Sequence, residues 1–150
     1  MSEVKKIMAA IAFSKYSQGI LNYAAKLAQD LEAGLVVGNV INIRDVRAVG
    51  KIEAMGYKVD ADDYVKGIRE ERAARLEEML KSSGIPAEKV SAVYEVGHPS
   101  EKLLKIVEDE KVDLIVMGSK GRSDLPNVFV GSVAEKMFRH SPTPVLFYRG

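Results

Sequence analysis

The 150-residue chain contains no cysteine, so disulfides, thiol catalysis and thiolate-held metals are excluded. It also lacks an excess of either charge. Its 22 basic and 21 acidic residues are interleaved and leave a net charge of +1, which gives no patch for DNA, RNA or an anionic membrane. No apolar run approaches the roughly 18 residues of a membrane span, and no secretion segment is visible. We therefore expect a cytoplasmic protein with no membrane or nucleic-acid partner.

Familiar catalytic and metal-binding patterns are missing too. The two histidines, His98 and His140, are expected on a turn and near a helix end, and the acids lack metal-ligand spacing. Neither GxxxxGK[ST] nor GxGxxG occurs, so a P-loop or dinucleotide site is unsupported. Residues 9–13 bring no acid to the end of the first strand, which excludes a response-regulator receiver. Residues 14–19 could form a weak flavodoxin-type phosphate loop, so flavin binding remains a remote alternative.

Length and pattern indicate one domain, residues 1–150, with 47% apolar residues to build its core. Apolar runs predict five strands, at 4–13, 35–41, 89–96, 112–117 and 144–148. Helical spacing predicts four helical segments. The first follows Ser14 or Ser17, either of which can cap it, and the second begins near Asp62. The third ends near Glu110, and the fourth spans 132–140. Residues 42–61 show no clean period and are expected to be an excursion with a short helix.

Local features give further expectations. Gly34 is expected to end the first helix in the left-handed conformation, and Gly38 to mark a bend or a close backbone approach within the second strand. The charged run 69–75 is interpreted as a solvated helix face. Four-apart pairs are expected between Glu71 and Arg75 and between Glu77 and Lys81.

Strands that alternate with helices predict an α/β fold of the flavodoxin-like or Rossmann-like class, with a mostly parallel sheet covered on both faces. In such windings the first strand lies centrally, next to the strand at which the order reverses, and ligands bind in the crevice there. The crevice should therefore lie between residues 10–13 and Met117–Gly118.

The stretch from Val112 to Arg139 carries the strongest functional pattern. Its apolar strand breaks at Gly118, Gly121 follows, and Gly131 with Ser132 opens a helical segment. Glycines let the backbone approach a ligand closely, and a helix N-terminus offers free N–H groups and a favourable dipole for anions. We interpret the loop as a phosphate site. The alternative is a tight turn followed by an ordinary capping box of Ser132 and Glu135.

Taken together, these segments resemble the nucleotide-binding branch of the universal stress protein family. That branch carries Gly, two residues, Gly, nine residues, Gly and then Ser or Thr, which here are Gly118, Gly121, Gly131 and Ser132. The flanking sequences IVMGSKGRS, GSVAEKMFRHSPTPVLFYR and KIMAAIAFSKYS are similar as well. The resemblance covers essentially the whole chain, most loosely at 42–61. It implies the strand order 3-2-1-4-5 and ATP as ligand, with Mg²⁺ or Mn²⁺ held through the phosphates only.

The resemblance also implies the nucleotide-binding residues, which are Ala10, Ala12, Val40, Met117, Gly118, Lys120, Gly121, Gly131, Ser132 and Val133. The residues from 117 to 121 would follow the ribose and phosphates, those from 131 to 133 the phosphate tail, and Val40 the adenine. One departure concerns Ala12, since the family commonly has an aspartate at this point, in patterns such as V-D-G-S. Without that carboxylate, one specificity contact is lost.

The implied function is a dimeric, adenine-nucleotide-binding regulator or sensor in the stress response. The dimer would pair the last strands, Pro144 to Tyr148, because an exposed edge strand has unpaired backbone groups. Two alternatives stay open. One is a dimeric interaction protein that no longer binds nucleotide, as Ala12 suggests. The other is a slow ATP hydrolase, although no acid, base or nucleophile is visibly aimed at the loop.

Overall fold

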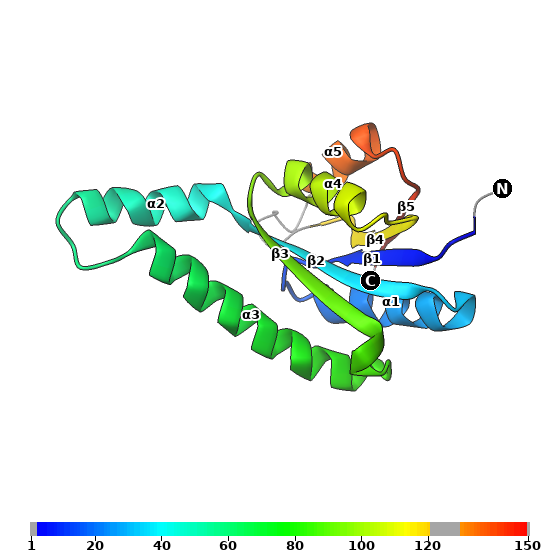
Figure 1. Ribbon diagram of the computed structural model, residues 1–150. Helices are drawn as coiled ribbons and strands as arrows, with labels where there is room; N and C mark the ends of the chain where they lie inside the picture. The colour runs from blue at the N-terminus through cyan, green and yellow to red at the C-terminus, as the bar shows by residue number, and fades with distance from the viewer. Residues whose placement is uncertain (1–2, 121–129, 150) are drawn as a thin grey trace.

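The computed structural model describes residues 3–120 and 130–149 (Figure 1). Its elements in chain order are β1 (Lys6–Ala10), α1 (Ser17–Leu31), β2 (Gly34–Asn42), α2 (Ile43–Ala54), α3 (Ala61–Ser83), a 3-10 turn (Ala87–Lys89), β3 (Val90–Gly97), α4 (Pro99–Asp109), β4 (Leu114–Gly118), α5 (Ser132–His140) and β5 (Val145–Tyr148). All strand pairs are parallel, and the order is β3-β2-β1-β4-β5. The predicted sheet and its order are confirmed.

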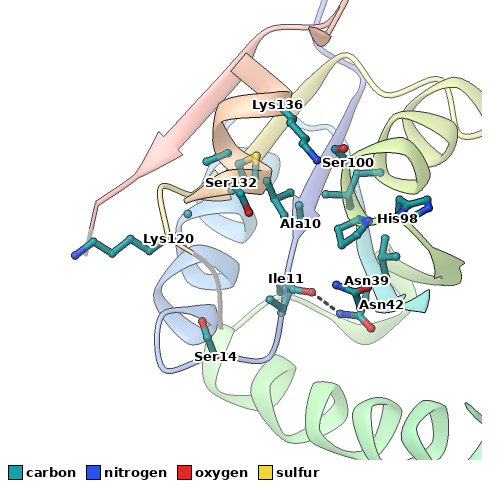
Figure 2. Close-up of a pocket in the computed structure, with 18 of the residues that line it drawn as sticks. Ala10, Ile11, Ser14, Asn39, Asn42, His98, Ser100, Lys120, Ser132 and Lys136 are labelled. Carbon is teal, nitrogen blue, oxygen red and sulfur yellow. Dashed lines mark hydrogen bonds between the residues drawn. The ribbon is translucent and has the colours of Figure 1, made fainter. Parts of the chain in front are cut away.

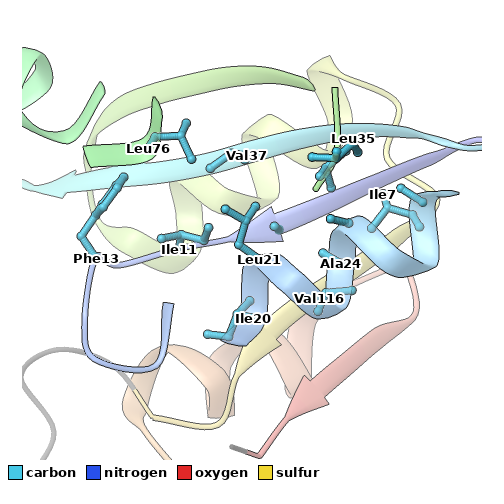
Figure 3. Close-up of a cluster of buried hydrophobic side chains, with 14 residues drawn as sticks. Ile7, Ile11, Phe13, Ile20, Leu21, Ala24, Leu35, Val37, Leu76 and Val116 are labelled. Carbon is cyan, nitrogen blue, oxygen red and sulfur yellow. The ribbon is translucent and has the colours of Figure 1, made fainter. Parts of the chain in front are cut away.

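Helices cover both faces of the sheet, as predicted. Side chains of successive strand residues point to opposite faces, so β1 contributes Ile7 and Ala9 to one core and Met8 to the other. The first core lies under α1 and α3 and includes Leu21 and Leu76 (Figure 3). The second lies under α4 and α5. This burial on both faces explains why the central strands read as almost unbroken apolar runs.

The first strand is shorter than predicted, since β1 ends at Ala10 and not at Phe13. Beyond it the chain turns away from the sheet, and Phe13 adopts a left-handed backbone with φ of 56°. Phe13 nevertheless stays buried at 3% exposure. Packing of its ring therefore holds a conformation that a bulky residue rarely adopts.

The expected boundaries of α1 are wrong at both ends. Glu32, not Gly34, takes the left-handed conformation after the helix, while Gly34 opens β2 and donates its N–H to the Lys5 carbonyl at 2.9 Å. At the start, Tyr16 is the N-cap residue and makes no side-chain cap. The serine hydroxyls instead accept hydrogen bonds within the preceding turn. The Ser14 hydroxyl accepts from the Tyr16 N–H, and the Ser17 hydroxyl accepts from the Ser14 N–H.

The predicted excursion at 42–61 contains a helix, α2, as expected, and this helix forms a hairpin with α3. Helix α2 follows β2 directly, capped by the Asn42 side chain, which accepts the Arg44 N–H at 2.9 Å. Helix α3 is capped by Asp60 and returns along the sheet. Figure 1 shows the pair projecting beyond the sheet. Within the described residues, no helix is long and apolar enough to cross a membrane.

Gly38 marks a close approach within an unbroken strand. A Cβ placed on it would lie 2.8 Å from Sδ of Met8. Neither expectation for this glycine is met as stated, because the strand continues through it and the group that approaches it is a side chain, not a second backbone segment. The glycine leaves room for the Met8 side chain between β2 and the α4 side of the core.

Candidate functional site

A cavity of about 510 Å³ opens at the carboxyl ends of β1, β2 and β4 (Figure 2). Its size falls within the range of small-molecule sites. The position is where the strand order reverses between β1 and β4, and ligands of open α/β sheets bind at this crevice. The cavity lies at the end of the sheet, and between the strands, where the crevice is predicted from sequence.

Most of the residues predicted from sequence line this cavity. They are Ala10, Ala12, Val40, Met117, Gly118, Lys120, Ser132 and Val133. Gly131 is buried and directly precedes α5 but does not line the cavity. Gly121 lies outside the described residues. The structure therefore gathers residues from four separate chain segments, while their contact with a nucleotide stays a prediction.

Apolar residues at the ends of β1 and β4 form the floor. Ala10 and Met117 are partners in the β1–β4 register, and both are nearly buried. The chain leaves β4 at Gly118, where an added Cβ would lie 3.0 Å from Cδ1 of Ile20 and 3.3 Å from the Lys120 carbonyl oxygen. A side chain at this point would crowd both neighbours. The glycine therefore allows the tight passage from strand to loop at the edge of the cavity.

Helix α5 begins at the cavity without a side-chain cap. Gly131 is its N-cap, and Ser132 is the first helical residue. The capping-box interpretation is wrong, because Glu135 pairs with Arg139 at 2.9 Å on the outer surface. The N–H groups of the first turn and the Ser132 hydroxyl thus remain at the cavity wall, where they suit an anion.

A buried polar network, not predicted from sequence, supports the opposite wall. Asn39 at 1% exposure donates from Nδ2 to the Ile11 carbonyl at 2.6 Å, and its Oδ1 accepts from Nη1 of Arg72 at 2.8 Å. Arg72 also lies 3.5 Å from the Val40 carbonyl. An asparagine inside the run LVVGNVI was a usable signal, because a buried amide requires partners.

The expectation of a simple solvated face at 69–75 is therefore only partly right. Arg75 is exposed, yet it donates to the Phe13 carbonyl at 3.3 Å, and Arg69 donates to the Tyr94 carbonyl at 3.3 Å. The predicted pairing of Lys81 with Glu77 is replaced by a 3.0 Å contact with Glu78. Arginines of α3 thus reach the carboxyl edge of the sheet and brace it.

Polar residues of α4 and α5 complete the cavity, and sequence analysis missed their role. His98 is the N-cap residue of α4 in an extended conformation, not on the predicted turn, and it lines the cavity with Ser100 and Lys136. His140 ends α5, as predicted, and does not line it. Helical spacing alone gave no sign that Ser100 and Lys136 would face one cavity.

The donor set does not suit a protein-held metal ion. In the part of the chain that the structure describes, no group of three His, Cys, Asp or Glu side chains could hold one. Among the described lining residues Asp45 brings the only carboxylate, and it already pairs with Nε of Arg44 at 3.4 Å. Divalent hard cations prefer several oxygen ligands. A nucleotide-bound cation would have to be held through the phosphates.

The fold is that of an α/β protein of the flavodoxin-like class, with a cavity at the point where the strand order reverses. A family profile described as the Universal stress protein family matches residues 3–149. The chain therefore belongs to the universal stress protein family.

Individual relatives agree with this placement. The chain is 29% identical to universal stress protein MJ0577 of Methanocaldococcus jannaschii over 153 aligned positions, covering 95% of this chain and 93% of the relative. The solved structure of MJ0577 superposes with a TM-score of 0.77 at 28% identity, covering 99% and 98% of the two chains.

Two more distant structures contain nucleotides. A universal stress protein in complex with cAMP matches with a TM-score of 0.66 at 24% identity, covering 99% of each chain. One from Archaeoglobus fulgidus in complex with dAMP matches with a TM-score of 0.66 at 15% identity, covering 99% and 100%. At these identities the likeness to this chain is one of fold.

Proposed function

We propose that the chain binds ATP, or a related adenine nucleotide, in this cavity and acts as a dimeric regulator or sensor in the stress response. The observation that carries the proposal is the convergence of eight predicted residues on one cavity beside the uncapped start of α5. The cAMP and dAMP complexes of two fold relatives support the choice of nucleotide class. A cytoplasmic location stays a prediction from sequence.

The arrangement divides the nucleotide between two ends of the cavity. Phosphates would lie along Gly118 and the first turn of α5, where the Ser132 hydroxyl and backbone N–H groups act as donors. The base would lie toward Val40, whose strand is fixed by the Asn39 and Arg72 network. Ala10 and Met117 supply an apolar floor between the two ends.

Binding is the function that we propose for the cavity. The carboxylate among its described lining residues, that of Asp45, is engaged by Arg44. The cavity can therefore hold and orient a nucleotide, and occupancy is the property that a regulator needs. Mg²⁺ or Mn²⁺ would accompany ATP only as a phosphate-bound ion.

The dimer is proposed through β5. Val145 and Phe147 pack toward the α5 side of the sheet, and Leu146 and Tyr148 toward the α1 side. The side chains of β5 are therefore partly covered on both faces. Among the residues that the structure describes, one backbone edge of β5 pairs with β4 and the other edge pairs with no strand. A second copy of β5 would satisfy the open edge.

Calorimetric titration with ATP tests the binding proposal. Ser132→Ala should weaken ATP binding by roughly 1–3 kcal/mol, the range for a hydrogen bond to a charged group. Ser91→Ala is the matched control, because Ser91 is exposed on β3 at the far edge of the sheet. Equal affinity of wild type and Ser132→Ala would contradict the assignment of the phosphates to α5.

Mass spectrometry of small molecules released from the denatured, purified protein provides an independent test. We expect an adenine nucleotide at a substantial fraction of one per chain. A preparation that carries none, and that also fails to bind added ATP, would favour the interaction-protein alternative suggested by Ala12.

A further inference from the structure

Lys136 lies on the cavity side of α5, one turn after Ser132. The two residues are four apart, so they share one face of the helix. Both line the cavity, as does Ser100 in the first turn of α4. Figure 2 shows the Lys136 side chain reaching from α5 toward Ser100 across the opening between the helices. An ammonium group and two hydroxyls thus surround one end of the cavity.

The charge of Lys136 has no carboxylate to balance it among the residues that the structure describes. Its acidic neighbour Glu135 is paired with Arg139 at 2.9 Å on the outer face. The one carboxylate among the described lining residues, that of Asp45, is paired with Arg44. Because a lysine ammonium and hydroxyls are donors, the group they surround should be an oxyanion.

The other cationic side chains of the described lining lie away from Ser132 or pair with other residues. Arg72 is held at the opposite wall, where Nη1 bonds Oδ1 of Asn39. Arg44 is engaged by Asp45. Figure 2 shows the Lys120 side chain running away from Ser132 and Lys136. Lys136 is thus the lining cation that shares a face of α5 with Ser132, near the start of the helix where the phosphates are expected.

We propose that Lys136, with Ser100 and Ser132, supplies the counter-charge for the phosphates, so that this chain does not require a divalent cation to bind a nucleoside triphosphate. The inference rests on the proposed nucleotide function. It follows from a donor set poor in carboxylates, including an alanine at position 12, combined with a cavity-lining lysine on the face of α5 that carries Ser132. Metal-free ATP carries more negative charge than its Mg²⁺ complex, so a lysine attracts it more strongly.

Calorimetric titrations in EDTA and in Mg²⁺ test this inference, with ATP and adenosine as the two probes. Wild type should bind ATP in EDTA at least as tightly as in Mg²⁺. Lys136→Gln should weaken ATP binding in EDTA about tenfold, because it removes one charge-assisted contact. Adenosine, which has no phosphate, should bind equally to both proteins. Lys136→Arg keeps the charge and should retain most of the affinity.

Arg139→Gln is the matched control. It removes one positive charge from the same helix, but from an exposed side chain that pairs with Glu135 outside the cavity. It should leave ATP affinity unchanged in both buffers. Both Lys136 and Arg139 are exposed, so neither substitution should affect folding, which circular dichroism can verify.

The outcomes separate the inference from the function on which it rests. ATP binding that requires Mg²⁺, or equal affinities for wild type and Lys136→Gln, would overturn the inference while the nucleotide site stands. An equal loss for Arg139→Gln would also overturn it, since general charge would then explain the effect. If no nucleotide binds in either buffer, the proposed function fails and the inference fails with it.

Discussion

Replacing Asn39 by alanine tests whether the polar network at the cavity wall stabilises the fold. Asn39 sits on β2 at 1% exposure and links the end of β1, through the Ile11 carbonyl, to Arg72 on α3. Alanine removes both hydrogen bonds at 2.6 and 2.8 Å and adds no polar group. It leaves the Ile11 carbonyl without its amide donor in a buried position.

The two bonds differ in kind, so their contributions are estimated separately. A neutral buried hydrogen bond contributes about 0.5–1.5 kcal/mol, and one to a charged group about 1.5–3 kcal/mol. The second value is reduced here, because Arg72 is only partly buried and water can replace the amide oxygen. Asn39→Ala should therefore lower the free energy of unfolding by about 2–3 kcal/mol.

Urea denaturation followed by circular dichroism measures this loss. Asn22→Ala is the control, because the Asn22 side chain makes one exposed bond, from Nε2 of Gln18 at 2.9 Å. The control should stay within about 0.5 kcal/mol of wild type. An Asn39→Ala protein within that same range would refute the network as a source of stability.

Three further predictions concern packing, ionisation and assembly. Gly38→Val should cost about 1–3 kcal/mol in thermal denaturation, because its Cβ would lie 2.8 Å from Sδ of Met8. Tyr94→Phe should raise stability by up to about 1 kcal/mol, since the buried hydroxyl finds no hydrogen-bond partner among the described residues. Burial raises the pKa of Tyr94 above its ordinary value, because it disfavours the ionised phenol. The free energy of unfolding of wild type should therefore be constant below about pH 10 with respect to this group and should fall as the pH rises further, whereas Tyr94→Phe should lack this fall. Val145→Pro should give monomers in light scattering at micromolar concentration by blocking the open edge of β5, and an unchanged dimer would contradict pairing through that strand.

The sheet could be predicted because its signal is local. Strands buried on both faces require nearly continuous apolar residues, and the runs at 35–41 and 112–117 meet that requirement. The positions at which the chain turns were harder to predict from sequence. Phe13 and Glu32 adopt left-handed conformations that local preference assigns to glycine. At Phe13 packing decides, since the Arg72 and Arg75 guanidinium groups lie 5.9 and 5.4 Å from the ring centre.

The residues of the candidate site also divide into those that could be predicted from local sequence and those that could not. The glycines and Ser132 lie close together in the sequence, so their spacing is visible in the amino-acid order itself. Arg72, Ser100 and Lys136 lie on three different helices, and only the winding of the chain brings them to one cavity. Their polar character is ordinary for exposed helix positions, which is why spacing along each helix gave no sign of a shared site.

Chemical-shift mapping by NMR tests the central claim most directly, because it locates the nucleotide on the molecule. Titration of the ¹⁵N-labelled protein with ATP should shift the amide signals of Ala10, Val40, Met117 and Ser132, which surround the cavity. Amides at the opposite ends of the strands, such as Leu35 and Val90, should stay unchanged. Absent shifts, or shifts centred at those opposite ends, would contradict a nucleotide site at the carboxyl edge of the sheet.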